Sequence, residues 1–270
     1  MCRSTTISPL SRPTRSTGNS MIIWLRSLLF LTFGFTTVLI YATVIMLLFW
    51  APRSWRRALV VHYCNLCLWA GDFFCGMKVV VEGAENIPAE PSVIMIKHTT
   101  TLETYGHVPM FPPTAWVVKR ELIWAPIFGW AIGLVLSPIA IKRSARGNAV
   151  KQVISKGKQK LASGIWVTIF PEGTRMPPGE TRKYGVSGAA LAQEANVMIV
   201  PVAHNAGDLW RRREFVKRPG TVRFCIGPPI SAQGRPPKET NLLVQEWIEN
   251  KMKEISTAYQ DKQEPNDPTD

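Results

Sequence analysis

The sequence predicts an α/β domain with a largely parallel central sheet flanked by helices, preceded by an N-terminal membrane helix or helical hairpin. From residue 77 onward, short runs rich in Val, Ile and aromatic residues alternate with longer helical stretches. Such alternation favours a parallel sheet, and strands covered on both faces are expected to be almost wholly apolar. Residues 27–50 contain no charged side chain and exceed the roughly 20 residues that cross a bilayer core.

The N-terminal region divides into an arm and an anchor. Residues 1–20 are rich in Ser, Thr and Arg and contain no acid, so we expect a disordered arm or an upstream extension before Met21, a natural start. Residues 21–76 are predicted to hold the membrane-anchoring helices. The second apolar stretch, residues 58–77, is either an interfacial helix or the return arm of a hairpin.

Aromatic and basic residues follow the first apolar stretch. Trp50, Arg53 and Trp55 are typical of an interfacial anchor rather than a signal-peptide cleavage site. If the arm is discounted, the positive-inside rule places the main domain in the cytoplasm. We therefore expect an inner (cytoplasmic) membrane protein with its main domain on the cytoplasmic side.

The remaining chain is predicted to form one domain over residues 77–258 and a disordered acidic tail over 259–270. Strands are expected at residues 77–82, 92–96, 115–118, 135–141, 165–170, 197–203 and 222–226. Helices are expected near residues 101–108, 121–133, 147–162, 184–195 and 240–257.

Charge and cysteine usage restrict the class of partner. The 270 residues carry 32 Lys+Arg against 19 Asp+Glu, a formal net charge of +13. This balance indicates an anionic partner: nucleic acid, a phospholipid surface or a phosphorylated substrate. Cys64 and Cys67 form a CxxC without a second pair, so packed thiols are favoured over a metal site. No disulfide framework is indicated, and no metal is expected.

The stretch "IKHTTTLETY", residues 96–105, places His98 at the exit of a predicted strand and Glu103 in the first turn of the following helix. A turn between them can fold the carboxylate back onto the imidazole. Alternatively, Thr100 to Glu103 matches a capping box, in which the glutamate only accepts a hydrogen bond from the N-cap amide.

The stretch "IFPEGTR", residues 169–175, follows another buried strand. Gly173 allows a tight turn, and Arg175 can bind a phosphate with its bidentate fork. The alternative is an ordinary polar loop in which Glu172 and Arg175 are paired.

Together these stretches resemble the glycerolipid acyltransferase family, in particular its 1-acyl-glycerol-3-phosphate acyltransferases. That family carries a His-x4-Asp block, a Lys/Arg-containing block, a Phe-Pro-Glu-Gly-Thr-Arg block and a Val-Pro-Val-like strand, in this order. The matching stretches are His98 to Glu103, "VVKRELIWAPIFGW" at 117–130, "FPEGTR" at 170–175 and "IVPVAHNAG" at 199–207. The agreement in order covers roughly residues 80–230.

The resemblance implies acyl transfer from an acyl thioester to the sn-2 hydroxyl of lysophosphatidic acid, in phospholipid biosynthesis. His98 would be the general base and Glu103 its orienting acid. Arg175, and second Lys119, would bind the substrate phosphate. Glu172 would either orient Arg175 or contact a glycerol oxygen, within a substrate-binding loop that includes Gly173 and Thr174. No cofactor is implied beyond acyl-CoA or acyl carrier protein as co-substrate.

Two segments admit two interpretations each. The apolar run 122–136 offers walls for an acyl tunnel or forms plain core packing. The basic stretch 142–160 forms a solvated helix face, or a patch that faces anionic head groups or the phosphates of an acyl donor.

Two departures from the family keep alternatives open. Glu103 stands where the family usually has Asp, and Lys97 where Asn is common. Glutamate in this block resembles the late acyltransferases of lipid A synthesis, so another lysolipid or a lipid A precursor is the alternative acceptor. The non-enzyme alternatives are a basic nucleic-acid-binding protein and an inactive membrane scaffold. The four blocks and the membrane segment favour the enzyme, with no nucleic acid as partner.

Overall fold

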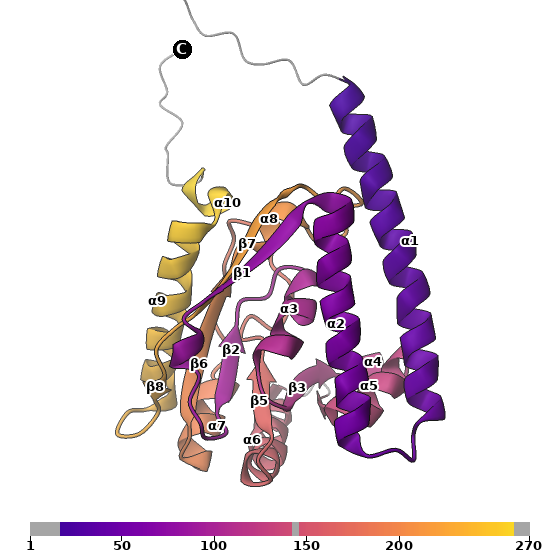
Figure 1. The fold of residues 1–270 in the computed structure, drawn as a ribbon. Helices are drawn as coiled ribbons and strands as arrows, with labels where there is room; N and C mark the ends of the chain where they lie inside the picture. The colour runs from indigo at the N-terminus through magenta and orange to yellow at the C-terminus, as the bar shows by residue number, and fades with distance from the viewer. Residues whose placement is uncertain (1–16, 142–145, 262–270) are drawn as a thin grey trace, which may run out of the picture.

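A computed structural model of the chain describes residues 17–141 and 146–261 (Figure 1). Within these residues the core is one eight-stranded sheet. Its strands are β1 Met77–Glu82, β2 Val93–Ile96, β3 Thr114–Lys119, β4 Ile139–Ile141, β5 Trp166–Ile169, β6 Met198–His204, β7 Gly220–Ile226 and β8 Ile230–Ser231.

The strand order is β1-β7-β6-β2-β5-β3-β4, with β8 paired to β6. The pairings of β6 with β7 and β8 are antiparallel, whereas those of β1 with β7, β2 with β5 and β6, and β3 with β4 and β5 are parallel. The predicted largely parallel α/β fold is therefore confirmed. As a consequence, the carboxyl ends of β2, β5 and β6 meet at one edge of the sheet.

Helices cover both faces of the sheet (Figure 1). Side chains of α6, α7 and α9, such as Val153, Leu191 and Ile248, pack in one hydrophobic cluster, while α3 and α2 contribute Leu102 and Ala70 to another. The helical segments are α1 Thr17–Leu47, α2 Arg53–Cys75, η1 Ala84–Asn86, α3 Leu102–Met110, α4 Arg120–Ile123, α5 Phe128–Leu136, α6 Arg146–Ala162, α7 Ser187–Ala195, α8 Ala206–Leu209, α9 Pro237–Ile255 and α10 Thr257–Gln260.

The structure corrects the predicted element between residues 121 and 141. The expected helix 121–133 is broken into α4 and α5, because Pro126 lacks an N–H and disfavours a helical residue before it. The expected strand 135–141 begins only at Ile139. Helix α5 continues to Leu136 and ends at Ser137 in the left-handed conformation, with φ 42°.

Two predicted segment boundaries also shift. Helix α1 begins at Thr17, so residues 17–20 of the predicted arm are helical, and residues 1–16 lie outside the described residues. The predicted tail begins too early: Tyr259 is buried in α10, and its hydroxyl lies 2.7 Å from Oε2 of Glu249. Burial of this ring among the core residues fixes the segment that composition alone marked as polar. Residues 262–270 lie outside the described part.

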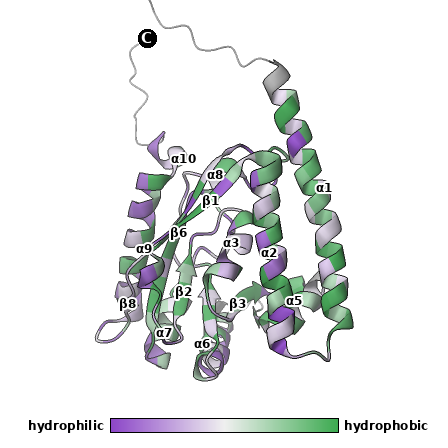
Figure 2. Cartoon of the chain, viewed as in Figure 1, coloured by the Kyte–Doolittle hydropathy of each residue, from purple (hydrophilic) through white to green (hydrophobic). Residues whose placement is uncertain are grey.

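Helices α1 and α2 lie side by side against one side of the domain (Figure 1). Both are long and apolar enough to cross a membrane, over Ser20–Leu47 and Arg53–Cys75. Figure 2 shows their largely hydrophobic colouring. Large apolar side chains remain exposed on them, namely Leu25, Leu29, Phe35, Leu39, Ile40, Leu47, Trp55, Trp69 and Phe73. Many exposed large apolar side chains on two neighbouring helices indicate membrane association.

The N-terminal part of α1 and the C-terminal end of α2 are attached to the α/β domain. Ser27 Oγ accepts a hydrogen bond from the backbone N–H of Lys217 at 2.8 Å, and Trp24 stacks on Phe215 with ring centroids 5.0 Å apart. Helix α2 ends at Gly76, whose φ of 68° is accessible to glycine at little cost, and β1 starts at the next residue. These contacts hold α1 and α2 against the edge of the sheet that β1 forms.

Candidate active site

The backbone of His98 is held from two sides where the chain leaves β2. Its N–H donates to Oε2 of Glu172 at 2.8 Å, and its carbonyl accepts from the N–H of Met176 at 2.8 Å. Both partners belong to the loop that follows β5, the parallel neighbour of β2. The "HTTTLE" and "FPEGTR" stretches, which are far apart in the sequence, therefore form one site.

The carboxylate of Glu103 is fully buried and contacts two sets of donors. Its Oε1 is hydrogen-bonded to Nδ1 of His98, while Oε2 accepts from the backbone N–H groups of Thr99 and Thr100, both at 2.9 Å. The two interpretations of Glu103 are therefore both realised, since one oxygen orients the imidazole and the other caps the helix start. With Nδ1 donating, the proton-accepting nitrogen of His98 is Nε2.

His204 is a third member of this site, and sequence reasoning missed it. Its Nε2 lies 2.8 Å from the carbonyl oxygen of Lys97 and 3.1 Å from Oε2 of Glu103. His204 is the last residue of β6, which is parallel to β2. A pairing of these two strands would have been the signal, because it brings both histidines to the same edge.

We call His98, Glu103 and His204 the histidine cluster. Burial of Glu103 by itself would raise the pKa of its carboxyl, but the neighbouring His98 and His204 lower that pKa well below its usual range. Glu103 is therefore an anion at any pH near neutrality. His98 is the member open to solvent, with 14% of its side chain exposed, and its ring stacks on Phe170 with centroids 4.0 Å apart.

A second cluster lies behind the first. Lys97, whose side chain is fully buried, places its Nζ 2.6 Å from Oε1 of Glu172 and 2.9 Å from Oε1 of Glu249. The hydroxyl of Tyr184 donates to the same Glu249 oxygen at 2.7 Å. We call Lys97, Glu172 and Glu249 the lysine cluster; it ties the loop after β5 to α9.

The prediction for Glu172 needs correction. Instead of orienting Arg175 or facing the substrate, Glu172 is 3% exposed and uses its two oxygens for Lys97 and for the N–H of His98. Burial raises the pKa of Glu172 to about 7, although Lys97 partly offsets this shift. No local pattern predicts this contact, because Lys97 follows β2, which is far from Glu172 in the sequence although β2 and β5 are neighbours in the sheet.

The other predicted substrate-binding residues lie at the same edge of the sheet. Gly173, with φ 69°, forms the expected turn through its N–H to the carbonyl of Phe170 at 2.9 Å. Thr174 and Arg175 follow and are half-buried. Lys119 ends β3 and is exposed, with Nζ 3.9 Å from a carboxylate oxygen of Glu121.

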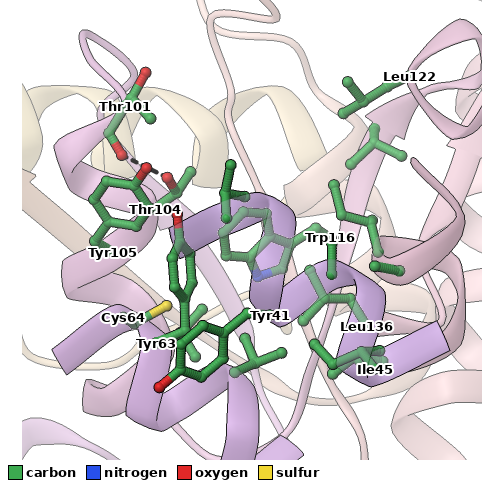
Figure 3. Close-up of a pocket in the computed structure, with 18 of the residues that line it drawn as sticks. Tyr41, Ile45, Tyr63, Cys64, Thr101, Thr104, Tyr105, Trp116, Leu122 and Leu136 are labelled. Carbon is green, nitrogen blue, oxygen red and sulfur yellow. Dashed lines mark hydrogen bonds between the residues drawn. The ribbon is translucent and has the colours of Figure 1, made fainter. Parts of the chain in front are cut away.

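An apolar cavity of about 240 Å³ lies beside this edge (Figure 3). Figure 3 shows Trp116, Tyr41, Ile45 and Leu136 projecting toward it. Its lining is drawn from α1, α2, α3, β3, α4 and α5, and includes Arg175 as a cation. The lining residues from the run 122–136 are Leu122, Ala131, Ile132, Val135 and Leu136. Part of that run thus lines a cavity, and Ala131 and Leu136 also pack in hydrophobic clusters, so both interpretations of the run hold for part of it.

No group of three or more His, Cys, Asp or Glu side chains is arranged to hold a metal ion in the part of the chain that the structure describes. Cys64 and Cys67 are buried in α2 as free thiols, among the apolar residues of one cluster. This agrees with the interpretation of the CxxC as packed thiols.

Comparisons with known proteins indicate the family. A family model described as "Acyltransferase" matches residues 78–205. The 1-acyl-sn-glycerol-3-phosphate acyltransferase of Pseudomonas aeruginosa is 42% identical over 211 residues, which cover 77% of this chain and 82% of that protein. The 1-acyl-sn-glycerol-3-phosphate acyltransferase alpha of Homo sapiens is 29% identical over 191 residues, covering 68% of this chain and 67% of that protein.

A solved structure has the same fold. The crystal structure of the 1-acyl-sn-glycerophosphate (LPA) acyltransferase PlsC from Thermotoga maritima matches with a TM-score of 0.72. The match covers 87% of this chain and 96% of that one, at 23% sequence identity. At this identity the likeness supports the architecture of the sheet and its helices.

Proposed function

The chain belongs to the acyltransferase family, and we propose that it acylates the sn-2 hydroxyl of 1-acyl-sn-glycerol-3-phosphate with an acyl thioester, giving phosphatidic acid in phospholipid biosynthesis. Its relatives from Pseudomonas aeruginosa and Homo sapiens carry the name of this activity. The observation that carries the proposal is the His98–Glu103 pair next to an apolar cavity whose lining includes Arg175.

In the proposed reaction His98 is the general base. Its Nε2 takes the proton of the sn-2 hydroxyl as that oxygen attacks the thioester carbonyl, because an alkyl hydroxyl is a poor nucleophile at neutral pH. When the tetrahedral intermediate collapses, the carbon–sulfur bond breaks and the imidazolium returns the proton to the thiolate. Proton transfer of this kind contributes about 10²–10⁴-fold. No acyl-enzyme and no cofactor are needed.

Glu103 stabilises the imidazolium and fixes its tautomer, as the acid of a catalytic triad does. Its charge is secured by two backbone N–H donors in addition to His98. Glu172 acts on the reaction only through His98. By accepting the backbone N–H of His98, it positions the base, and it is a positioning residue in this proposal rather than a substrate ligand.

Substrate binding divides between the cavity and the loop after β5. The apolar cavity suits an acyl chain, and the guanidinium of Arg175 suits the phosphate of the lysolipid through its planar fork. Lys119, at the carboxyl end of the neighbouring strand β3, is the second cation for this phosphate. Gly173 and Thr174 shape the loop that presents Arg175.

The anchor brings this site to the substrate. We infer that α1 and α2 insert into the membrane, so that lysolipids enter from the lipid phase. Exposed Trp50, Trp55, Trp124 and Trp130 suit an interfacial level, where indole rings prefer to lie. The proposed location is the inner membrane, with α1 and α2 inserted in one leaflet as a hairpin, so that Arg53, Arg56 and Arg57 and the α/β domain all lie on the cytoplasmic side.

The test is a turnover assay with the full chain in lipid nanodiscs. Purified protein is given a panel of lysophospholipids, a lipid A precursor, acyl-CoA and acyl carrier protein thioesters, and products are identified by mass spectrometry. Phosphatidic acid should be the main product, and His98→Gln should abolish it. Preferential acylation of another lysolipid or of the lipid A precursor would refute the proposed acceptor. Thioester consumption equal in wild type and His98→Gln would refute the proposed base.

A further inference from the structure

A second pocket lies on the other side of the loop that carries Arg175. It has a volume of about 500 Å³, and its lining consists of Arg175, Pro177, Pro178, Arg211, Arg212, Arg213, Ala258 and Asp261. We call it the arginine pocket. Four of its lining residues are arginines and Asp261 is the acid among them. Arg211, Arg212 and Arg213 are exposed, so the pocket is an open surface hollow that concentrates positive charge.

Among the described residues, the arginines of this pocket have no ion-pair partner at close range, although Arg211 interacts over a longer distance with the carboxylates of Asp208 and Glu214. In the ranges 17–141 and 146–261, none of the ion pairs within 4.0 Å involves Arg175, Arg211, Arg212 or Arg213. Glu214, the next residue, is paired with Arg218 at 2.5 Å. Asp208 accepts hydrogen bonds from Ser256 and Thr257 at 2.9 and 3.0 Å. Clustered guanidinium groups repel one another, and a bound anion relieves this repulsion.

The arginine pocket is joined to the candidate active site through the backbone. Nη1 of Arg212 donates to the carbonyl of Arg175 at 3.3 Å, and the next residue, Met176, donates its N–H to the carbonyl of His98. Arg175 lines both the arginine pocket and the apolar cavity. A molecule with an apolar end and an anionic end can therefore bind with the apolar end in the cavity and the anionic end in the arginine pocket. Its reactive centre would then lie near His98.

We propose that the arginine pocket binds the nucleotide phosphates of acyl-CoA, the acyl donor. This proposal rests on the proposed function and specifies its donor. One guanidinium suffices for the single phosphate of a lysolipid, whereas several arginines suit the diphosphate and the additional ribose phosphate of coenzyme A, since each planar fork can bind a phosphate in a bidentate manner. The volume of about 500 Å³ is sufficient for a nucleotide.

The first experiment changes two arginines that do not contact the Arg175 carbonyl. Arg211→Gln/Arg213→Gln in nanodiscs should raise the KM for acyl-CoA about tenfold or more, because hydrogen bonds between charged groups are lost. The KM for the lysolipid and the KM for an acyl carrier protein thioester should not change. The matched control is Arg235→Gln/Lys238→Gln, which removes the same charge from two exposed positions at the start of α9 and should leave all three KM values unchanged.

A thioester of dephospho-coenzyme A, which lacks the ribose phosphate, sharpens the result. Wild type should bind it less tightly than acyl-CoA, and the double variant should discriminate less between the two donors. A rise in the KM for the lysolipid alone would assign the pocket to the lysolipid phosphate and overturn the proposal. A rise for the carrier-protein thioester alone, or weaker sedimentation with phosphatidylglycerol vesicles at unchanged donor KM, would overturn it as well.

The second experiment needs no variant. Adenosine 3′,5′-bisphosphate, which carries phosphates without an acyl chain, should inhibit wild type competitively against acyl-CoA and not against the lysolipid. Its binding is also measured by calorimetry on the full chain. Calorimetric binding that Arg211→Gln/Arg213→Gln weakens supports the pocket even if no lysolipid is acylated, which would refute the proposed function alone. Absence of binding in an enzyme that acylates lysophosphatidic acid would refute the pocket alone.

Discussion

Consecutive residues Lys97 and His98 leave strand β2 toward two different environments. The side chain of Lys97 is fully buried, and its partners Glu172 and Glu249 close around it. The side chain of His98 has one fixed partner, Glu103, and remains partly exposed. The histidine cluster is thus open on one side, whereas the lysine cluster is closed.

This difference suits two roles: the histidine cluster can exchange protons with a substrate, and the lysine cluster stabilises the structure around it. An imidazole that exchanges protons with a substrate needs one nitrogen held and the other accessible. A buried ammonium group needs its charge compensated on every side, since an unpaired charge in the interior is costly. The clusters are linked by Glu172, which contacts both Lys97 and the His98 N–H. A substitution in one cluster should therefore alter the geometry of the other.

The largest effect is expected from Glu103→Gln, in the open cluster. Glutamine keeps the size and an oxygen for the Thr99 and Thr100 amides, so the fold should persist. The lost charge no longer stabilises the imidazolium, and a comparable loss in serine protease triads costs about 10⁴-fold. We expect kcat to fall at least about 10²-fold in the nanodisc assay. Glu103→Asp should retain more activity than Glu103→Gln, and a folded Glu103→Gln enzyme of nearly normal kcat would show that Glu103 only caps the helix.

Lys97→Met should affect stability first, in the closed cluster. It leaves the carboxylates of Glu172 and Glu249 buried without their cation, a loss that typically costs about 3–5 kcal/mol. Denaturant unfolding measures the change. Adding Glu249→Gln to Lys97→Met should recover part of the stability, because one uncompensated charge disappears. Wild-type stability of the single variant would mean that water, rather than Lys97, balances the two acids.

Glu172→Gln tests the link between the clusters through pH. The pKa of Glu172 is about 7 in the folded chain and has a reference value of 4.5, so the folded state binds this proton more tightly than the unfolded state. Wild-type stability should therefore decline as the pH rises from about 4.5 to 7, by on the order of 1–3 kcal/mol. Unfolding curves across this range should show a smaller decline for Glu172→Gln. Parallel pH profiles of the two proteins would contradict the raised pKa.

Arg175→Lys tests whether the open side of the histidine cluster includes Arg175 as a phosphate ligand, and it should have the smallest effect. A point charge replaces the planar fork, so bidentate phosphate binding is lost while the positive charge remains. We expect the KM for the lysolipid to rise about tenfold, with a smaller change in the KM for the thioester. Steady-state kinetics with each substrate varied in turn measures both values. An unchanged lysolipid KM would remove Arg175 from the phosphate site.

Local patterns predicted most of the elements. The strands over 77–82, 92–96 and 165–170 were found within one residue at each end, because buried parallel strands are short apolar runs bounded by polar turns. The expected helix 121–133 is wrong because Pro126 interrupts it, although the apolar run around this residue is compatible with a helix. Helix α1 extended further than expected, since the uncharged stretch marks only the part that needs an apolar environment.

The sequence by itself determined the membrane-type segments, the α/β alternation, and the order of the blocks that carry His98, Glu103 and Arg175. These features depend on neighbours in the chain, where spacing and side-chain type suffice. Only the tertiary structure decided that His204 joins Glu103, that Glu172 is held by Lys97 instead of Arg175, and that Arg211 to Arg213 line a pocket with Arg175. Each of these contacts joins segments on different strands or loops, and the order in which strands pair within the sheet, which brings such segments together, is not encoded in any local pattern.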